Sequence, residues 1–151
     1  MSPTTVILLV ILASVVASLG IAAVLVRIGR RRAEANIASL GPIERSMAAS
    51  SLGLTSPGPA QVRSTGTLVL TADEVAFAQW RPERFVRIPR ADLLAVDTTR
   101  EHLGRTLKGD VLRLRWRQSG AADGEQTIAL FVRDLDDWVH ALGGTPRAPA
   151  D

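Results

Sequence analysis

The sequence lacks the residues on which much protein chemistry depends. Its 151 residues contain no cysteine, no tyrosine and only two histidines. The absence of cysteine excludes disulfide bonds, thiolate zinc sites, iron–sulfur clusters and a cysteine nucleophile. The scarcity of histidine and tyrosine leaves few groups for general acid–base catalysis. No carboxylate cluster has metal-ligand spacing, and we therefore predict a protein that is not an enzyme and uses no metal or cofactor.

An excess of charge of one sign is also missing from most of the chain. Residues 61–151 contain thirteen basic and thirteen acidic residues, whereas residues 1–60 contain five arginines and two glutamates, a net charge of +3. Proteins that bind nucleic acid generally present a net positive surface. The balanced charge of the second segment therefore argues against nucleic acid as a partner.

One long segment carries no charge at all. Residues 6–26 read VILLVILASVVASLGIAAVLV and follow a short tail, residues 1–5. A helix of this length spans about 30 Å, which matches the hydrocarbon thickness of a bilayer. We predict a transmembrane helix over 6–26. The spacings Ser14-x3-Ser18 and Ala13-x3-Ala17 would allow close approach of two such helices, a hint of self-association.

Four arginines follow this run directly: Arg27, Arg30, Arg31 and Arg32. Such a cluster is typical of the cytoplasmic flank of a membrane helix. We therefore predict a single-pass protein of the inner (cytoplasmic) membrane, with its N-terminus outside and residues 27–151 in the cytoplasm. The same arginines could also attract anionic lipid headgroups, at about 1 kcal/mol each.

A cleaved signal peptide is the alternative interpretation of this region. Ala33-Glu34-Ala35 has the A-x-A form of a cleavage site. Against cleavage, the first five residues contain no basic residue, and the apolar run exceeds the roughly 7–15 residues usual in a signal peptide. If cleavage did occur, the product would be a secreted β domain beginning near Asn36.

Residues 27–60 are predicted to be a basic juxtamembrane segment and linker. Alanine, serine, glycine and proline dominate from Ala33 onward, which is typical of a tether with limited order. Helix could continue over residues 31–40, where Gly41-Pro42 would end it.

After Arg63, short alternating segments separated by turn residues predict an antiparallel barrel or sandwich. The six predicted strands are residues 65–70, 75–80, 85–89, 93–99, 111–118 and 126–132. We expect residues 100–110 to form a polar connection in which His102 is solvated.

The strand over 111–118 has the clearest period of two in the chain. Leu112, Leu114 and Trp116 are predicted to face inward, and the residues that alternate with them to face outward: Arg113, Arg115 and Arg117. These arginines are candidates for an anion-facing ladder. The interpretation that we favour is a solvated row paired with acidic neighbours on adjacent strands.

A short helix is predicted to close the fold. Its apolar residues recur at helical spacing: Leu135, Trp138, Val139 and Leu142. We expect Asp134 to cap its N-terminus and Gly143 to end it. About ten residues are too few for a stable isolated helix, so this one must pack on the sheet. Residues 144–151 would form a tail.

This arrangement resembles the bacterial pleckstrin-homology-like (PH-like) domains and the related GRAM-type domains. The resemblance covers roughly residues 61–143. It rests on G-x-L-x-L-T at Gly66–Thr71, I-P-x-x-D-L at Ile88–Leu93, and Trp138. The chain also resembles small membrane-anchored PH-like proteins with one N-terminal helix. The resemblance implies seven strands, so one more is expected, either within residues 48–54 or in a long first strand beginning near Gln61.

Phosphoinositide-binding members of the wider family hold phosphates with basic residues that flank the first hairpin. The turn predicted at that place contains Asp73 and Glu74, which would repel a phosphate. A phosphoinositide site is therefore not expected. The resemblance favours a non-catalytic protein-interaction or scaffolding module at the cytoplasmic membrane face, with a protein partner or a second copy of itself. Engagement of anionic lipid is the alternative.

Overall fold

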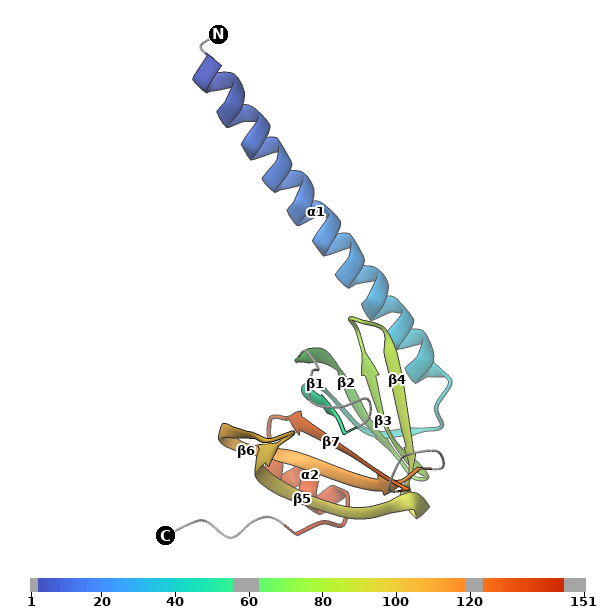
Figure 1. The fold of residues 1–151 in the computed structure, drawn as a ribbon. Coiled ribbons are helices and arrows are strands. Elements are labelled where there is room, and N and C mark those ends of the chain that lie inside the picture. The colour runs from blue at the N-terminus through green and yellow to red at the C-terminus, as the bar shows by residue number, and fades with distance from the viewer. Residues whose placement is uncertain (1–2, 56–62, 119–123, 146–151) are drawn as a thin grey trace.

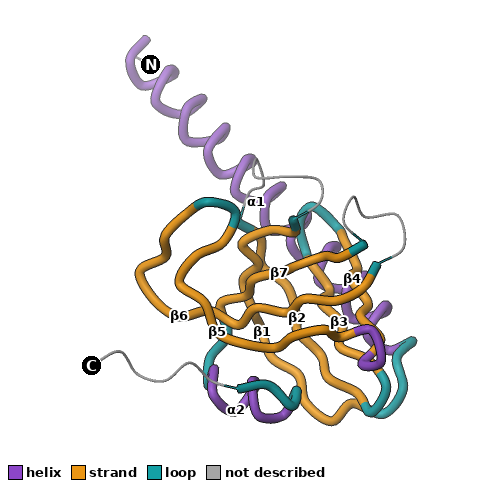
Figure 2. Tube along the Cα trace, turned by 60° about the horizontal axis from the view of Figure 1, so that its bottom comes forward, coloured by secondary structure: helices purple, strands orange, loops and turns teal. Residues whose placement is uncertain are grey.

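The computed structural model describes residues 3–55, 63–118 and 124–145 (Figure 1). In chain order the elements are α1 (Pro3–Ala38), β1 (Ile43–Leu54), β2 (Ser64–Thr71), β3 (Glu74–Gln79), β4 (Arg84–Pro89), the 3-10 turn η1 (Arg90–Asp92), β5 (Leu93–His102), β6 (Arg105–Arg117), β7 (Glu125–Phe131) and α2 (Leu135–Ala141). In both Figure 1 and Figure 2, α1 projects from the β domain and α2 lies on the side away from it.

The seven strands form one antiparallel sheet in the order β4-β3-β2-β1-β7-β6-β5. The sheet is open, with β4 and β5 as its edges, and β1 lies at its centre between β2 and β7. These features confirm the predicted fold class: mainly β, seven antiparallel strands, a long helix before them and a short helix after them.

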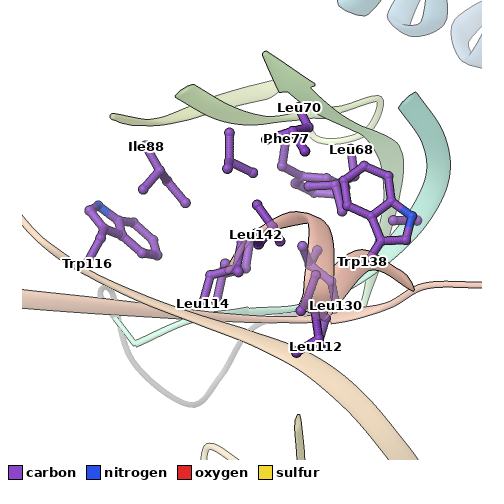
Figure 3. Close-up of a cluster of buried hydrophobic side chains, with 14 of the residues drawn as sticks. Leu68, Leu70, Phe77, Ile88, Leu112, Leu114, Trp116, Leu130, Trp138 and Leu142 are labelled. Atoms are coloured by element: carbon purple, nitrogen blue, oxygen red, sulfur yellow. The ribbon is translucent and has the colours of Figure 1, made fainter. Parts of the chain in front are cut away.

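The core lies between the two halves of the bent sheet (Figure 3). Leu68, Leu70 and Phe77 of β2 and β3 face Leu112 and Leu130 of β6 and β7, and all are nearly inaccessible to solvent. Each comes from a strand whose side chains alternate between two faces, so the period of two in the sequence places them together. Two tryptophans lie on opposite sides of this core, Trp116 beside Ile88 and Trp138 on α2.

The expected apolar stripe of α2 packs against this core. Trp138 and Val139 are buried, Leu142 is 6% exposed, and Leu135 packs against the same cluster while partly exposed. The prediction that the side chain of Asp134 caps the N-terminus of α2 is wrong. Asp134 adopts a left-handed conformation (φ 55°) and its side chain makes no capping hydrogen bond.

The end of α2 agrees with the sequence. Gly143 has φ 75°, a conformation that favours glycine, and its N–H donates to the carbonyl of His140. The N–H of Gly144 donates to the carbonyl of Val139. These two bonds satisfy carbonyls that the end of a helix otherwise leaves unpaired.

The predicted linker is wrong over residues 43–54, which form the central strand β1. The possible strand at residues 48–54 is therefore present and begins earlier, at Ile43, whereas β2 begins at Ser64. The buried positions include Ala49, Ser51 and Gly53. Small residues of low hydrophobicity suit a strand crowded on both sides, but they conceal its period of two.

The predicted connection over 100–110 is also wrong, because β5 and β6 continue through most of it. The two strands meet in a tight turn at Leu103 and Gly104, whose φ angles are both positive. Arg100 and Asp110 pair across the strands at 2.9 Å, so polar residues here line the outer side of a hairpin. His102 is 7% exposed and not solvated.

Replacing Trp138 by alanine should lower the free energy of unfolding by about 3–5 kcal/mol, because a large side chain is removed from a closed core. The neighbouring Asp137→Ala change removes an exposed group and should cost less than about 1 kcal/mol. Urea unfolding of the full chain in mild detergent measures both. Equal effects of the two changes would contradict the packing described for α2.

Candidate functional site

The second half of α1 packs on the outer face of the sheet. Gly29 and Ala33 are the buried residues of this helix, and Leu40 just beyond it is 8% exposed. An added Cβ at Gly29 would overlap the carbonyl oxygen of Trp80, so only glycine permits this approach. Helix and sheet are therefore in direct contact at the level of the β3–β4 turn.

Further along, the same face of α1 completes a second apolar cluster. Leu40 contacts Val69 and Ala76, the outward-facing residues of β2 and β3, and Ile37 and Phe85 pack beside them. Val69 and Ala76 are 0% and 1% exposed. The outer face of β2 and β3 is thus a packed surface, and α1 is the element that covers it.

Two of the four predicted membrane-flanking arginines contact the domain or their own helix. Arg32 pairs with Glu83 in the β3–β4 turn at 2.9 Å. Arg30 pairs with Glu34 at 3.0 Å, and its guanidinium lies 5.9 Å from the centre of the Trp80 ring. These interactions flank the contact at Gly29 on both sides.

The other two, Arg27 and Arg31, form no ion pair with any residue that the structure describes. Each lies two residues from Gly29 in sequence, which places it about 160° around the helix from the domain. Their charges therefore point away from the β domain. The predicted cluster of four arginines is divided by the packing of α1 into two contacting and two outward residues.

The ladder on β6 is largely paired. Arg113 binds Asp97 on β5 through two hydrogen bonds of 2.7 and 2.6 Å, which raise the pKa of Arg113 above its ordinary value. Arg115 lies 3.8 Å from Glu125 on β7. Arg117 has no ion-pair partner within the described ranges. This is the arrangement of a solvated row with acidic neighbours on adjacent strands.

The turn with Asp73 and Glu74 joins β2 to β3 and is not the first hairpin, because β1 precedes it. Glu74 is also not a free charge: Arg87 donates to it at 2.7 and 2.6 Å, which holds the pKa of the carboxyl group below its ordinary value. This turn is therefore no reason to exclude a phosphoinositide site, and the expected absence of such a site stays a prediction. The first connection, between β1 and β2, lies mostly outside the described residues.

An open groove of about 890 Å³ lies beside the edge strand β4. Its walls come from β4, the end of β6 and the facing ends of β1 and β7. The lining residues are Leu54, Arg84, Phe85, Val86, Arg87, Pro89, Asp92, Trp116, Arg117, Gln118 and Gln126. A smaller pocket of about 220 Å³ shares Leu54, Arg84 and Val86 with it.

The groove combines an apolar floor with a net positive rim. Trp116 is 3% exposed and closes the core beneath the groove. Arg84 and Arg117 have no acidic partner among the described residues, whereas Arg87 is neutralised by Glu74. No pattern in the sequence indicates this groove, because its residues come from strands that are brought together only in the folded sheet.

His102 links β5 to β1. Its Nε2 donates to the carbonyl of Gly53 at 2.9 Å, in the central strand. Burial lowers the pKa of His102; the bond to Gly53 opposes this shift and the charge of Arg113 adds to it. The described residues hold no group of three or more His, Asp or Glu side chains that could bind a metal.

The first helix is long and apolar enough to cross a membrane, a property it shares with signal sequences. The hydroxyl groups of its two serines, Ser14 and Ser18, are hydrogen-bonded within the helix. Each donates to the carbonyl four residues earlier at 2.8 Å. Polar side chains bonded in this way are compatible with a lipid environment.

No family model and no curated protein matches this chain. Among solved structures, the C-terminal domain of an unknown protein from Leishmania infantum is similar at 10% identity and a TM-score of 0.51. The match covers 74% of this chain and 89% of that one. The hSac2 domain from human phosphoinositide phosphatase Sac2 is 15% identical, with a TM-score of 0.47 over 68% of this chain and 66% of that one. The first likeness concerns the fold alone, and membership of the bacterial PH-like family stays a prediction.

Gly29→Ala should loosen α1 from the sheet, because the added methyl group meets the backbone of Trp80. Gly20→Ala adds the same methyl group where nothing lies within 4 Å and is the matched control. Since the chain has no cysteine, the pair Arg32→Cys and Glu83→Cys can be joined by a short bis-maleimide. We expect crosslinking to fall with Gly29→Ala only. Unchanged crosslinking in that variant would contradict the contact.

The stability of the domain should depend on pH through His102. Because folding lowers its pKa, the unfolded chain binds the proton more readily. The free energy of unfolding should therefore be highest above about pH 6.5 and fall as the pH decreases through that value. The stability that ionised Glu74 contributes is lost only at lower pH, because the ordinary pKa of this carboxyl group is 4.5 and folding lowers it.

His102→Gln keeps a donor for the Gly53 carbonyl but cannot titrate. Urea unfolding at a series of pH values should show the decrease near pH 6.5 in the wild type and not in this variant. The same decrease in both proteins would exclude His102 as its source.

Proposed function

We propose that this chain is a single-pass protein of the cytoplasmic membrane whose β domain is a non-catalytic binding module. In this proposal the N-terminus lies outside, α1 spans the bilayer, and residues 27–151 are in the cytoplasm. The observation that carries the proposal is the continuity of α1. One helix of 36 residues begins as an apolar run and ends packed on the outer face of β2 and β3.

The packing of α1 supports a retained helix over a cleaved signal peptide. Ala33, within the A-x-A motif, is 2% exposed and helical. Cleavage after Ala35 would remove Gly29 and Ala33 from their contact with the sheet and separate Arg32 from Glu83. The domain would lose part of its own packing together with the leader.

The groove beside β4 supports a protein segment as the ligand. An edge strand has unpaired backbone donors and acceptors, which an extended peptide can satisfy by adding a strand. Phe85 and Val86, which are partly exposed, would contact apolar side chains of that peptide. Arg84 and Arg117 are complementary to carboxylates. The proposed ligand is therefore an extended acidic segment of a protein partner.

The topology is testable with single cysteines at Thr5 and Asp137, both exposed, in a chain with a C-terminal epitope tag. In intact cells a membrane-impermeant maleimide should label Thr5→Cys and leave Asp137→Cys unlabelled until the cells are opened. The tagged chain should be full length and in the membrane fraction. A shortened, released chain, or labelling of Asp137→Cys from outside, would contradict the proposal.

The ligand class is testable with the full chain in nanodiscs and a displayed library of random peptides. We expect enrichment of acidic peptides and protection of the β4 amides from hydrogen exchange. Binding should be lost when Arg84→Glu and Arg117→Glu are combined. Arg105→Glu reverses an exposed charge outside the groove and should leave binding unchanged. Peptides that bind the double variant equally well would rule out this groove.

A further inference from the structure

The contact between α1 and the β3–β4 turn sets the height of that turn along the helix. Val26 ends the uncharged run, and Gly29, three residues later, touches the backbone of Trp80. Helical residues advance about 1.5 Å each, so the contact lies about 4.5 Å beyond the apolar run. Glu83, at the other end of the turn, is held by Arg32 at 2.9 Å.

This height coincides with a specific layer of the bilayer. If α1 spans the membrane as proposed above, Val26 lies at the edge of the hydrocarbon. The headgroup layer extends about 5–7 Å beyond that edge on each side. The β3–β4 turn, residues 80–83, then lies within the headgroup layer. Figure 1 shows this turn at the end of the domain nearest the apolar part of α1.

The chemistry of the turn suits that layer. Trp80 is half-buried, and its indole N–H donates to the hydroxyl of Thr67 at 3.3 Å. Tryptophan is enriched at membrane interfaces, where one part of the ring is apolar and the other polar. Arg81 is exposed and has no ion-pair partner in the described part of the chain. Because Glu83 is offset by Arg32, the turn presents one positive charge, that of Arg81, which no described residue offsets.

Further cations lie at the same height on the opposite side of α1. Arg27 and Arg31 face away from the domain and have no ion-pair partner within the described ranges, as noted above. With Arg81 they place positive charge on both sides of the helix. Anionic lipids attract such residues by about 1 kcal/mol each near the surface. The ladder on β6 does not belong to this set, since Arg113 and Arg115 have acidic neighbours.

We propose that the β3–β4 turn is a second membrane contact, in which Arg81 binds the phosphates of anionic phospholipids in the bilayer that α1 spans. The domain then rests against the membrane at two points, α1 and this turn. The groove beside β4 is held at a fixed height as a result. This inference deepens the proposed function and rests on α1 being a membrane helix.

Three single-cysteine variants carrying a nitroxide test the contact in nanodiscs of the full chain. Ser14→Cys reports on the middle part of the uncharged run 6–26 in α1. Thr65→Cys is exposed beside the turn, where the carbonyl of Thr65 accepts the N–H of Trp80. Ala72→Cys is exposed at the other end of β2. The measurement is the collision rate of each nitroxide with a water-soluble nickel chelate, in phosphatidylcholine with and without phosphatidylglycerol.

In discs that contain phosphatidylglycerol, we expect the Thr65 label to be several-fold less accessible to the chelate than the Ala72 label. The Ser14 label should be inaccessible in both lipids. A shielded Ser14 label with equal accessibility at Thr65 and Ala72 would overturn the second contact and leave the proposed function intact. An accessible Ser14 label would overturn both.

Charge reversal identifies the residue responsible. Arg81→Glu should raise the accessibility of the Thr65 label in phosphatidylglycerol discs to the level seen in phosphatidylcholine alone. Arg105→Glu makes the same change of charge at an exposed position on β6 and should have no effect. Shielding that persists with Arg81→Glu, or that is equal in both lipids, would overturn the role assigned to Arg81.

Discussion

The contact of Gly29 with the backbone of Trp80 is the constraint on which the arrangement of this protein depends. A helix approaches a sheet this closely only where it carries no Cβ. The contact allows Ala33 and Leu40 to reach the sheet, so that Val69 is covered on the outer face. Helix α1 and the β domain therefore form one packed unit, and the orientation of the sheet follows the direction of α1.

Because of this packing, the position of the β domain depends on α1. The β domain supplies a groove with an apolar floor and two arginines, Arg84 and Arg117, that have no acidic partner among the described residues, a combination that suits the proposed binding of a ligand. The helix sets the height of the β3–β4 turn and, through the sheet, that of the groove. Under the proposed function, a binding module fixed in this way would meet ligands at a defined distance from the membrane, which a flexible tether would not provide.

Much of the fold could be predicted from the sequence, because apolar residues that alternate along a strand, or recur at helical spacing, mark the faces that are buried in the structure. Leu112, Leu114 and Trp116 face the core as their period of two predicts, and α2 packs through the expected stripe. The central strand β1 could not be predicted with equal clarity, since three of its four buried positions are occupied by Ala49, Ser51 and Gly53. Small residues carry little hydrophobic contrast.

The candidate site was harder to predict, for two physical reasons. The groove is lined by β4 and by the ends of β1, β6 and β7. These strands come together only through the order of the sheet, which the sequence does not reveal. The contact of α1 did leave a signal: Gly29, Ala33, Ile37 and Leu40 recur at helical spacing beyond the apolar run, and Val69 and Ala76 are apolar on the outer face of their strands. The two patterns become informative only when considered together.

The most direct test of the packing of α1 on the sheet is the distance between the apolar part of α1 and the β domain. Nitroxides on Ser18→Cys and Ala72→Cys, in nanodiscs of the full chain, report that distance by double electron–electron resonance. If α1 is packed on the sheet as described, we expect one narrow distribution at the separation seen in the structure. A broad distribution would contradict this packing, because the β domain would then move freely relative to α1.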